Sequence, residues 1–146
     1  MRDGESMQTQ ILWPLLAQVA LTFALLFRLG PARIAAIRRG EVRLKNVALG
    51  QDAWPERITQ LSNSYKSQFE LPVLFHLAVV VGLATGKADQ ALVALAWGFV
   101  ATRLVHAYIH TTSNEVRWRF NAFLGGALLL LGMWVVLALR LAGFQG

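Results

Sequence analysis

The sequence predicts an all-α integral membrane protein built as a four-helix bundle. Of its 146 residues, 55% are hydrophobic and only 15% are charged, whereas soluble domains carry about 25% charged residues. The charges lie mostly outside four long apolar stretches, 11–27, 71–85, 91–109 and 120–139. About 20 helical residues cross the hydrocarbon core, and open strands leave backbone groups unpaired there. Each stretch therefore predicts one membrane-spanning helix.

We expect spans of about 11–28, 66–85, 90–110 and 119–140 within a single membrane domain over residues 1–146. Near Gly30 and Pro31 the first helix should kink or end, although proline also suits the first turn of a continuing cytoplasmic helix. The second stretch, 71–85, covers only about 22 Å as a helix, which is short of the roughly 30 Å required. This span should therefore extend back through Glu70 to about Lys66.

The connections between the spans differ in charge. Residues 28–66 hold eight basic and three acidic residues, and residues 111–119 hold two basic and one acidic. Residues 86–90 are balanced, and the first ten residues carry one net negative charge. Positively charged loops stay in the cytoplasm, so the first and third connections should face it and both termini should face away. This pattern accounts for the net charge of +6 without a nucleic-acid surface.

Polar residues recur along one face of the second predicted helix. Asn63, Lys66, Ser67 and Glu70 follow the spacing i, i+3, i+4 and i+7, which places them on one side of a helix. A carboxylate directed at lipid is energetically costly, so this stripe should face protein or a water-filled cavity. It is either part of a binding site or a salt-bridged anchor at the end of the helix.

The third predicted helix carries Arg103, His106 and His110 on one face. Arg103 should lie about 10 Å inside the membrane end, counted from His110, and Glu70 at similar depth is its natural partner. This pair is either structural or part of a ligand contact. For the histidines, an interhelical hydrogen bond is the default expectation. The sequence has no cysteine and no His-Glu-x-x-His pattern, so we expect no metal site.

The two stripes should meet near the cytoplasmic boundary, close to four further basic residues, Arg43, Lys45, Arg117 and Arg119. Such a cationic pocket with one acidic group suits a small ligand that bears carboxylates. Because the pocket lies partly in the membrane, a second, apolar substrate could reach it from the lipid.

The order of these motifs resembles that of the MAPEG family, the membrane-associated proteins of eicosanoid and glutathione metabolism. The resemblance covers essentially the whole chain. It is carried by Gly-Glu-Val-Arg-Leu-Lys at 40–45, by Gln-Phe-Glu-Leu-Pro-Val-Leu-Phe at 68–75, and by 97–119 with Arg103-x-x-His106 and Asn114-x-x-x-x-Arg119.

The resemblance implies a left-handed bundle assembled as a homotrimer, with glutathione as co-substrate bound between neighbouring subunits at the cytoplasmic side. It also implies that Arg43 contacts a glutathione carboxylate, that Glu70 binds its backbone or amino group, and that His106 lines the site. Arg119 would hold the glutathione thiol as a thiolate, because an adjacent cation lowers a thiol's pKa. The full predicted glutathione-binding set is Arg43, Asn63, Lys66, Ser67, Glu70, Arg103, His106 and His110, with Arg119 as the catalytic residue.

Four positions depart from the family pattern. Arginines usually stand seven and four residues before the glutamate, where this chain has Asn63 and Lys66. An asparagine and a tyrosine of the pattern are replaced by Ser67 and His110. Lys66 keeps the positive charge but cannot bind a carboxylate in a bidentate manner, and Asn63 has no charge.

Two functions remain open from the sequence. The first is a glutathione-dependent transferase or peroxidase that acts on lipophilic electrophiles. The second is a non-catalytic, lipid- or partner-binding member, which the altered arginine pattern favours. A transporter is disfavoured because the chain lacks the inverted repeats and broken segments that such proteins use.

Overall fold

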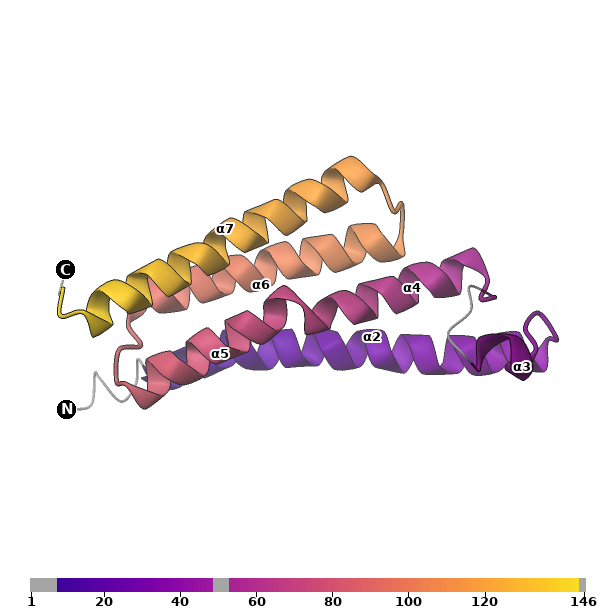
Figure 1. Cartoon of the computed structure of the whole chain (residues 1–146), viewed down its shortest axis with the longest axis horizontal. Coiled ribbons are helices and arrows are strands. Elements are labelled where there is room, and N and C mark those ends of the chain that lie inside the picture. Colours follow the sequence, from indigo (N-terminus) through magenta and orange to yellow (C-terminus); the bar gives the residue numbers. More distant parts are fainter. Residues whose placement is uncertain (1–7, 49–52, 145–146) are drawn as a thin grey trace.

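The computed structural model describes residues 8–48 and 53–144, and every regular element within these ranges is helical. In chain order the elements are α2 (Leu12–Arg38), α3 (Leu44–Val47), α4 (Glu56–Lys66), the 3-10 helix η1 (Ser67–Phe69), α5 (Leu71–Ala84), α6 (Gln90–Thr111) and α7 (Val116–Leu141). Figure 1 shows four long rods aligned along one axis, the second of which is formed by α4, η1 and α5 together. All four rods are long and apolar enough to cross a membrane. The predicted all-α class is confirmed.

The first helix does not end at its proline. α2 continues past Pro31 as far as Arg38, because this extension still has a packing partner. Leu29 is 3% exposed and packs in one cluster with Ile58 of α4. The chain then turns at Gly40, whose φ of 73° is favourable only for a residue without a Cβ.

The second rod begins at Glu56, well before the expected start near residue 66. As a result, α2 and α4 run side by side beyond the connection between α6 and α7 (Figure 1). This overhang was not predicted, because the polar composition of α4 resembles that of a loop.

The main apolar core lies between α5, α6 and α7. Phe75 and Phe99 are fully buried and stack with ring centroids 4.7 Å apart. α6 and α7 approach closely at Gly126, where an added Cβ would lie 2.7 Å from the hydroxyl oxygen of Thr102. In lipid there is little hydrophobic drive between helices, so close packing over small residues stabilises this hairpin.

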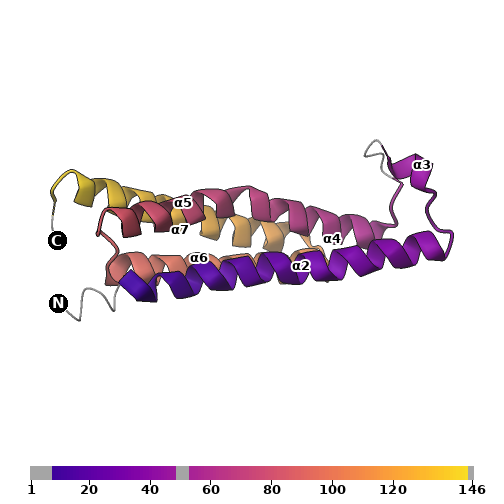
Figure 2. The same ribbon diagram turned by 90° about the horizontal axis from the view of Figure 1, so that it is seen from below.

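The termini lie at one end of the bundle and the α6–α7 connection lies at the other (Figures 1 and 2). The α5–α6 turn is fixed at the terminal end by Asp89, which caps α6 by accepting a hydrogen bond from the Leu92 amide at 3.0 Å. Asp89 also forms an ion pair with Arg140 of α7. Partial burial alone would raise the pKa of Asp89, but the hydrogen bonds from Arg140 and the Leu92 amide bring it below its usual value.

Candidate functional site

A helix break separates α4 from α5 at the position of the predicted polar stripe. Pro72, in the first turn of α5, has no N–H to donate, and Glu70 has a non-helical backbone with φ −101° and ψ −110°. Buried side chains supply hydrogen bonds at the break. The Ser67 hydroxyl donates to the Ser64 carbonyl at 2.8 Å, and the Gln68 amide donates to the same carbonyl at 2.9 Å. Polar side chains therefore make this interruption compatible with a buried environment.

Arg103 reaches the break from α6 and is only 1% exposed. Its Nη2 donates to the Ser67 carbonyl at 3.1 Å and to the Ser67 hydroxyl at 2.9 Å. The predicted ion pair with Glu70 is wrong, because among the described residues no ion pair within 4.0 Å joins the two. The break turns the Ser67 carbonyl toward the core, whereas Glu70 stays exposed and acts on Arg103 only by longer-range attraction.

A buried glutamine pair at the same break was not predicted as part of the site. Gln18 of α2 donates through Nε2 to Oε1 of Gln68 at 2.8 Å, and the two residues are 0% and 2% exposed. Gln18 was visible in the sequence as a polar interruption of the first span. Its partner lies 50 residues away, so spacing along one helix could not identify it.

One turn after Arg103, the same face of α6 contacts α7. His106 Nδ1 donates to the backbone carbonyl of Arg119 at 3.1 Å, so the default expectation of an interhelical hydrogen bond is confirmed for His106. His110 packs edge-to-face against His106, with ring centroids 5.5 Å apart. Within the described ranges His110 Nδ1 has no hydrogen-bond partner. One face of α6 thus links the helix break to the start of α7.

Arg119 is held in place by Asn114 at the start of α7. Its Nη1 donates to the side-chain oxygen of Asn114. Asn114 has a φ of 51°, in the left-handed region that asparagine tolerates better than most residues. Its backbone N–H also donates to the Ile109 carbonyl at 2.7 Å. Asn114 therefore both ends α6 and orients the guanidinium of Arg119.

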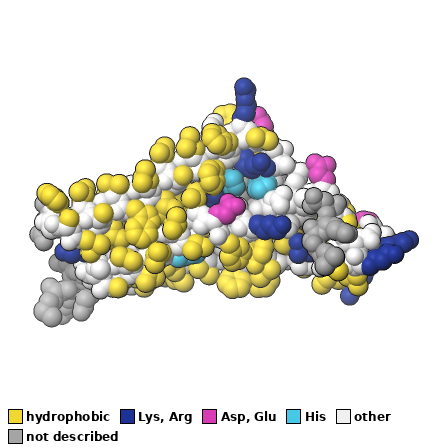
Figure 3. All heavy atoms as spheres, in the orientation of Figure 1, with side chains coloured by type: hydrophobic (Ala, Val, Ile, Leu, Met, Phe, Trp, Pro, Cys, Tyr) yellow, Lys and Arg dark blue, Asp and Glu magenta, His cyan; other side chains and the backbone are white. Residues whose placement is uncertain are grey.

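The predicted stripe on the second rod is divided by burial. Asn63, Lys66 and Glu70 are exposed on the surface of the chain, whereas Ser67 is buried against Arg103. Figure 3 shows acidic, basic and histidine side chains gathered in the middle of an otherwise hydrophobic face. A single chain therefore presents Asn63, Lys66 and Glu70 at its surface and does not enclose them.

Arg43 does not join the other predicted residues within one chain. It is an exposed residue at the N-terminus of α3, and Figure 1 shows α3 at the extreme end of the long axis, beyond α4. We expected Arg43 near the other predicted site residues because its loop precedes the second span. That loop extends away along the α2–α4 overhang.

A family model of the MAPEG family matches residues 11–139, which cover all four membrane-spanning rods apart from the outermost residues of the first and the last. The chain belongs to the MAPEG family. The resemblance stated from the motifs is thereby confirmed. Together with the four apolar helices, membership identifies this MAPEG protein as an integral membrane protein. No curated protein and no solved structure matched the chain.

Proposed function

We propose that this MAPEG protein binds glutathione and transfers it to lipophilic electrophiles, or uses two glutathione molecules, oxidised to glutathione disulfide, to reduce a lipophilic peroxide to its alcohol and water. In conjugation the glutathione thiolate attacks an electrophilic carbon, a carbon–sulfur bond forms, and the leaving group departs with the bonding electrons. The apolar substrate would reach the site laterally from the membrane. Membership of a family associated with glutathione supports this proposal.

The proposal rests on the surroundings of the Arg119 guanidinium, which is oriented but not neutralised. Its partner Asn114 is a neutral amide, and no ion pair within the described part of the chain neutralises its guanidinium. A fixed, half-buried cation without a counter-ion stabilises an adjacent thiolate and lowers the pKa of the bound thiol. Asn114 thus orients Arg119 without reducing its charge.

We further propose that the protein is a homotrimer with its sites between subunits. Asn63, Lys66 and Glu70 are exposed along a membrane-spanning rod, and charged residues facing lipid cost roughly 2.5–3.5 kcal/mol each on insertion scales. A neighbouring subunit would cover them. Lys66 would then attract a glutathione carboxylate and Glu70 its amino group, and Arg43 would reach the site of an adjacent chain.

The remaining predicted residues would shape this site from within the protomer. Ser67 and Arg103 fix the helix break that precedes Glu70. His106 fixes the backbone of Arg119, and His110 packs beside it. In this proposal they position the binding groups, while Arg119 touches the reacting sulfur.

The decisive experiment compares Arg119→Ala with Arg117→Ala, which removes an exposed arginine two residues away. With glutathione and a nitroaryl chloride, we expect Arg119→Ala to lose about 100-fold in conjugation rate at neutral pH, corresponding to a thiol pKa about two units higher. The pH profile of the remaining activity should shift upward. If wild-type protein neither forms conjugate nor is stabilised by millimolar glutathione, or if both variants behave alike, the proposal fails.

The second candidate function is a non-catalytic MAPEG protein that binds lipid or a partner. Asn63 and Lys66 favour it, because they replace two arginines that would bind glutathione carboxylates in a bidentate manner. A protein that retains lipid through purification but is not stabilised by glutathione would support this non-catalytic function. The same unfolding measurement therefore separates the two functions.

We also propose that both termini face away from the cytoplasm. Because the chain has no cysteine, single cysteines can report sidedness without background. Ser113→Cys lies in the α6–α7 connection and Thr85→Cys in the α5–α6 turn, and both positions are exposed. In intact cells, a membrane-impermeant maleimide should label only the cysteine at position 85. Labelling of position 113 alone would reverse the proposed orientation.

A further inference from the structure

Two cavities meet at a pair of arginines where α2 and α4 extend past the end of α6. The first, of about 450 Å³, lies between α2 and α4 and has an apolar wall that includes Pro31 and Ile58. The second, of about 620 Å³, is more polar and is lined by Gln60 and by the threonines at the end of α6. Arg28 and Arg57 line both cavities.

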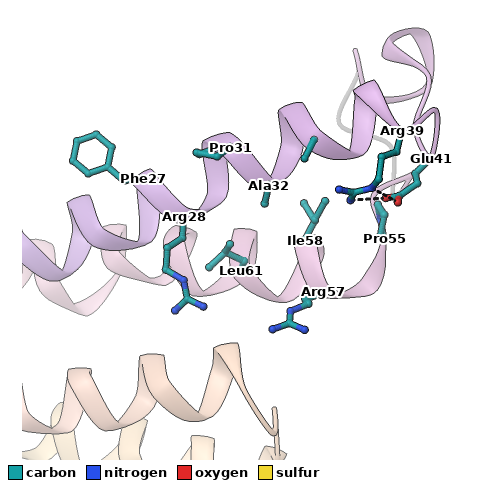
Figure 4. A pocket seen from close by; sticks show the side chains of 11 residues that line it. Phe27, Arg28, Pro31, Ala32, Arg39, Glu41, Pro55, Arg57, Ile58 and Leu61 are labelled. Atoms are coloured by element: carbon teal, nitrogen blue, oxygen red, sulfur yellow. Dashed lines mark hydrogen bonds and ion pairs between the residues drawn. The ribbon is translucent and has the colours of Figure 1, made fainter.

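Among the described residues neither of these two arginines is held in an ion pair, and the charged Glu56 is the one carboxylate lining the second cavity. Figure 4 shows both side chains pointing the same way, away from the apolar wall and toward the end of α6. The two carboxylates that line the cavities have other partners. Glu41 is paired with Arg39 at 2.6 Å, and Glu56 accepts a hydrogen bond from Gln60 at 3.4 Å.

The depth of the pair fits the region of lipid headgroups. Arg28 lies about 24 Å along α2 from its first residue, Leu12, at 1.5 Å per residue, near the end of a hydrocarbon core roughly 30 Å thick. Phe27 beside it is 70% exposed, as expected for a residue that faces lipid. Long arginine side chains extend toward the membrane surface, so we expect the two guanidinium groups at the level of the lipid headgroups.

We propose that Arg28 and Arg57 together bind the phosphate of an anionic phospholipid from the cytoplasmic leaflet. Guanidinium groups bind phosphate oxygens in a bidentate manner, and basic pockets between membrane helices on the cytoplasmic side bind anionic headgroups. Phe27 and Leu61, which line the first cavity on the side nearer the membrane centre, would receive the glycerol and the first methylenes of the lipid. None of these residues belongs to the proposed glutathione site, so the two proposals can fail independently.

The test measures lipid preference in the full-length protein. The protein is reconstituted in bilayers of mixed phosphatidylglycerol and phosphatidylcholine and then released from them. Native mass spectrometry measures the ratio of the two lipids that stay bound to the protein. Arg28→Gln and Arg57→Gln should each lower the preference for phosphatidylglycerol about five-fold, and the double variant about 25-fold. The matched control is Arg38→Gln, which removes an exposed arginine of α2 that lines neither cavity.

Several outcomes would overturn the proposal. If Arg38→Gln lowered the preference for phosphatidylglycerol equally, the preference would come from diffuse surface charge. If neither single variant lowered it, the arginine pair would be excluded, even if the double variant failed to fold. Release of the lipid by equimolar inorganic phosphate would make this a site for a free anion. Loss of glutathione-induced stabilisation in the Arg28 or Arg57 variants, with lipid preference unchanged, would assign the arginines to glutathione.

Discussion

Two regions of this MAPEG protein are built on different principles. The apolar half, nearer the termini, is the core around Phe75, Leu92, Phe99 and Met133, all of them 0% exposed. The polar half surrounds the helix break and contains the polar side chains described above, with Arg103 among the largest fully buried ones. α6 runs through both halves, but the second rod is a continuous helix in the apolar half and is broken in the polar half.

The two halves also differ in how completely their buried polar atoms are hydrogen-bonded. Most of the buried side-chain atoms without a hydrogen-bond partner in the described chain lie in the polar half, namely Gln18 Oε1, Ser64 Oγ, Arg103 Nε and Nη1, and His110 Nδ1. Unsatisfied polar groups are costly in a membrane. Their concentration on one side is expected where a ligand, water or second subunit completes the hydrogen bonds.

The largest expected effect lies in the apolar half. Phe99→Ala removes a fully buried ring stacked on Phe75 and should lower the free energy of unfolding by roughly 3 kcal/mol through the cavity it leaves. Leu104→Ala, at a site 49% exposed on the same helix, should cost less than about 1 kcal/mol. Reversible unfolding in mixed detergent micelles measures both. Equal losses would show that the apolar half is not close-packed.

A smaller effect is expected at the contact between α6 and α7. Gly126→Ala places a Cβ 2.7 Å from the Thr102 hydroxyl oxygen and should cost about 2 kcal/mol through overpacking. Thr102→Ala removes the obstructing atom, so the double variant should be more stable than the sum of the single losses predicts. Strict additivity in this double-mutant cycle would contradict a direct steric conflict.

In the polar half, the Gln18–Gln68 pair should contribute about 1 kcal/mol. Each single change to leucine leaves a buried amide without its partner, whereas changing both removes the unmet hydrogen bond. The coupling measured by a double-mutant cycle should be about 0.5–1.5 kcal/mol, as for other interhelical hydrogen bonds in membranes. A coupling near zero would mean that this half is not organised by the observed hydrogen bonds.

The smallest effect concerns pH at the terminal end. Because the pKa of Asp89 is lowered in the folded chain, its ion pair stabilises the fold at pH values above the unfolded pKa of about 3.9. This contribution is lost as the pH falls through the lower, folded pKa. Since the pair is partly exposed, the loss should stay below about 1 kcal/mol. Unfolding of Asp89→Asn should lack this acid-dependent component, and an unchanged pH dependence would contradict the assignment.

The candidate site was predicted in part. Hydropathy and the Arg103-x-x-His106 spacing identified a buried face of α6, because both residues are buried and contact neighbouring helices. The partner of Arg103 was predicted wrongly, since a periodic helix places Glu70 beside it. A break at Pro72 instead turns the Ser67 carbonyl inward, and a periodic pattern carries no information on such a break.

The sequence by itself determined that this protein crosses a membrane with four helices and belongs to the MAPEG family. These properties depend on hydrophobicity and residue order, both of which are local. Only the tertiary structure decided that Gln18 pairs with Gln68, that Arg103 binds a backbone carbonyl, and that α2 and α4 overhang the end of α6. Each of these depends on which distant side chains meet in space, where a buried polar group must bond to whatever partner the packed helices supply.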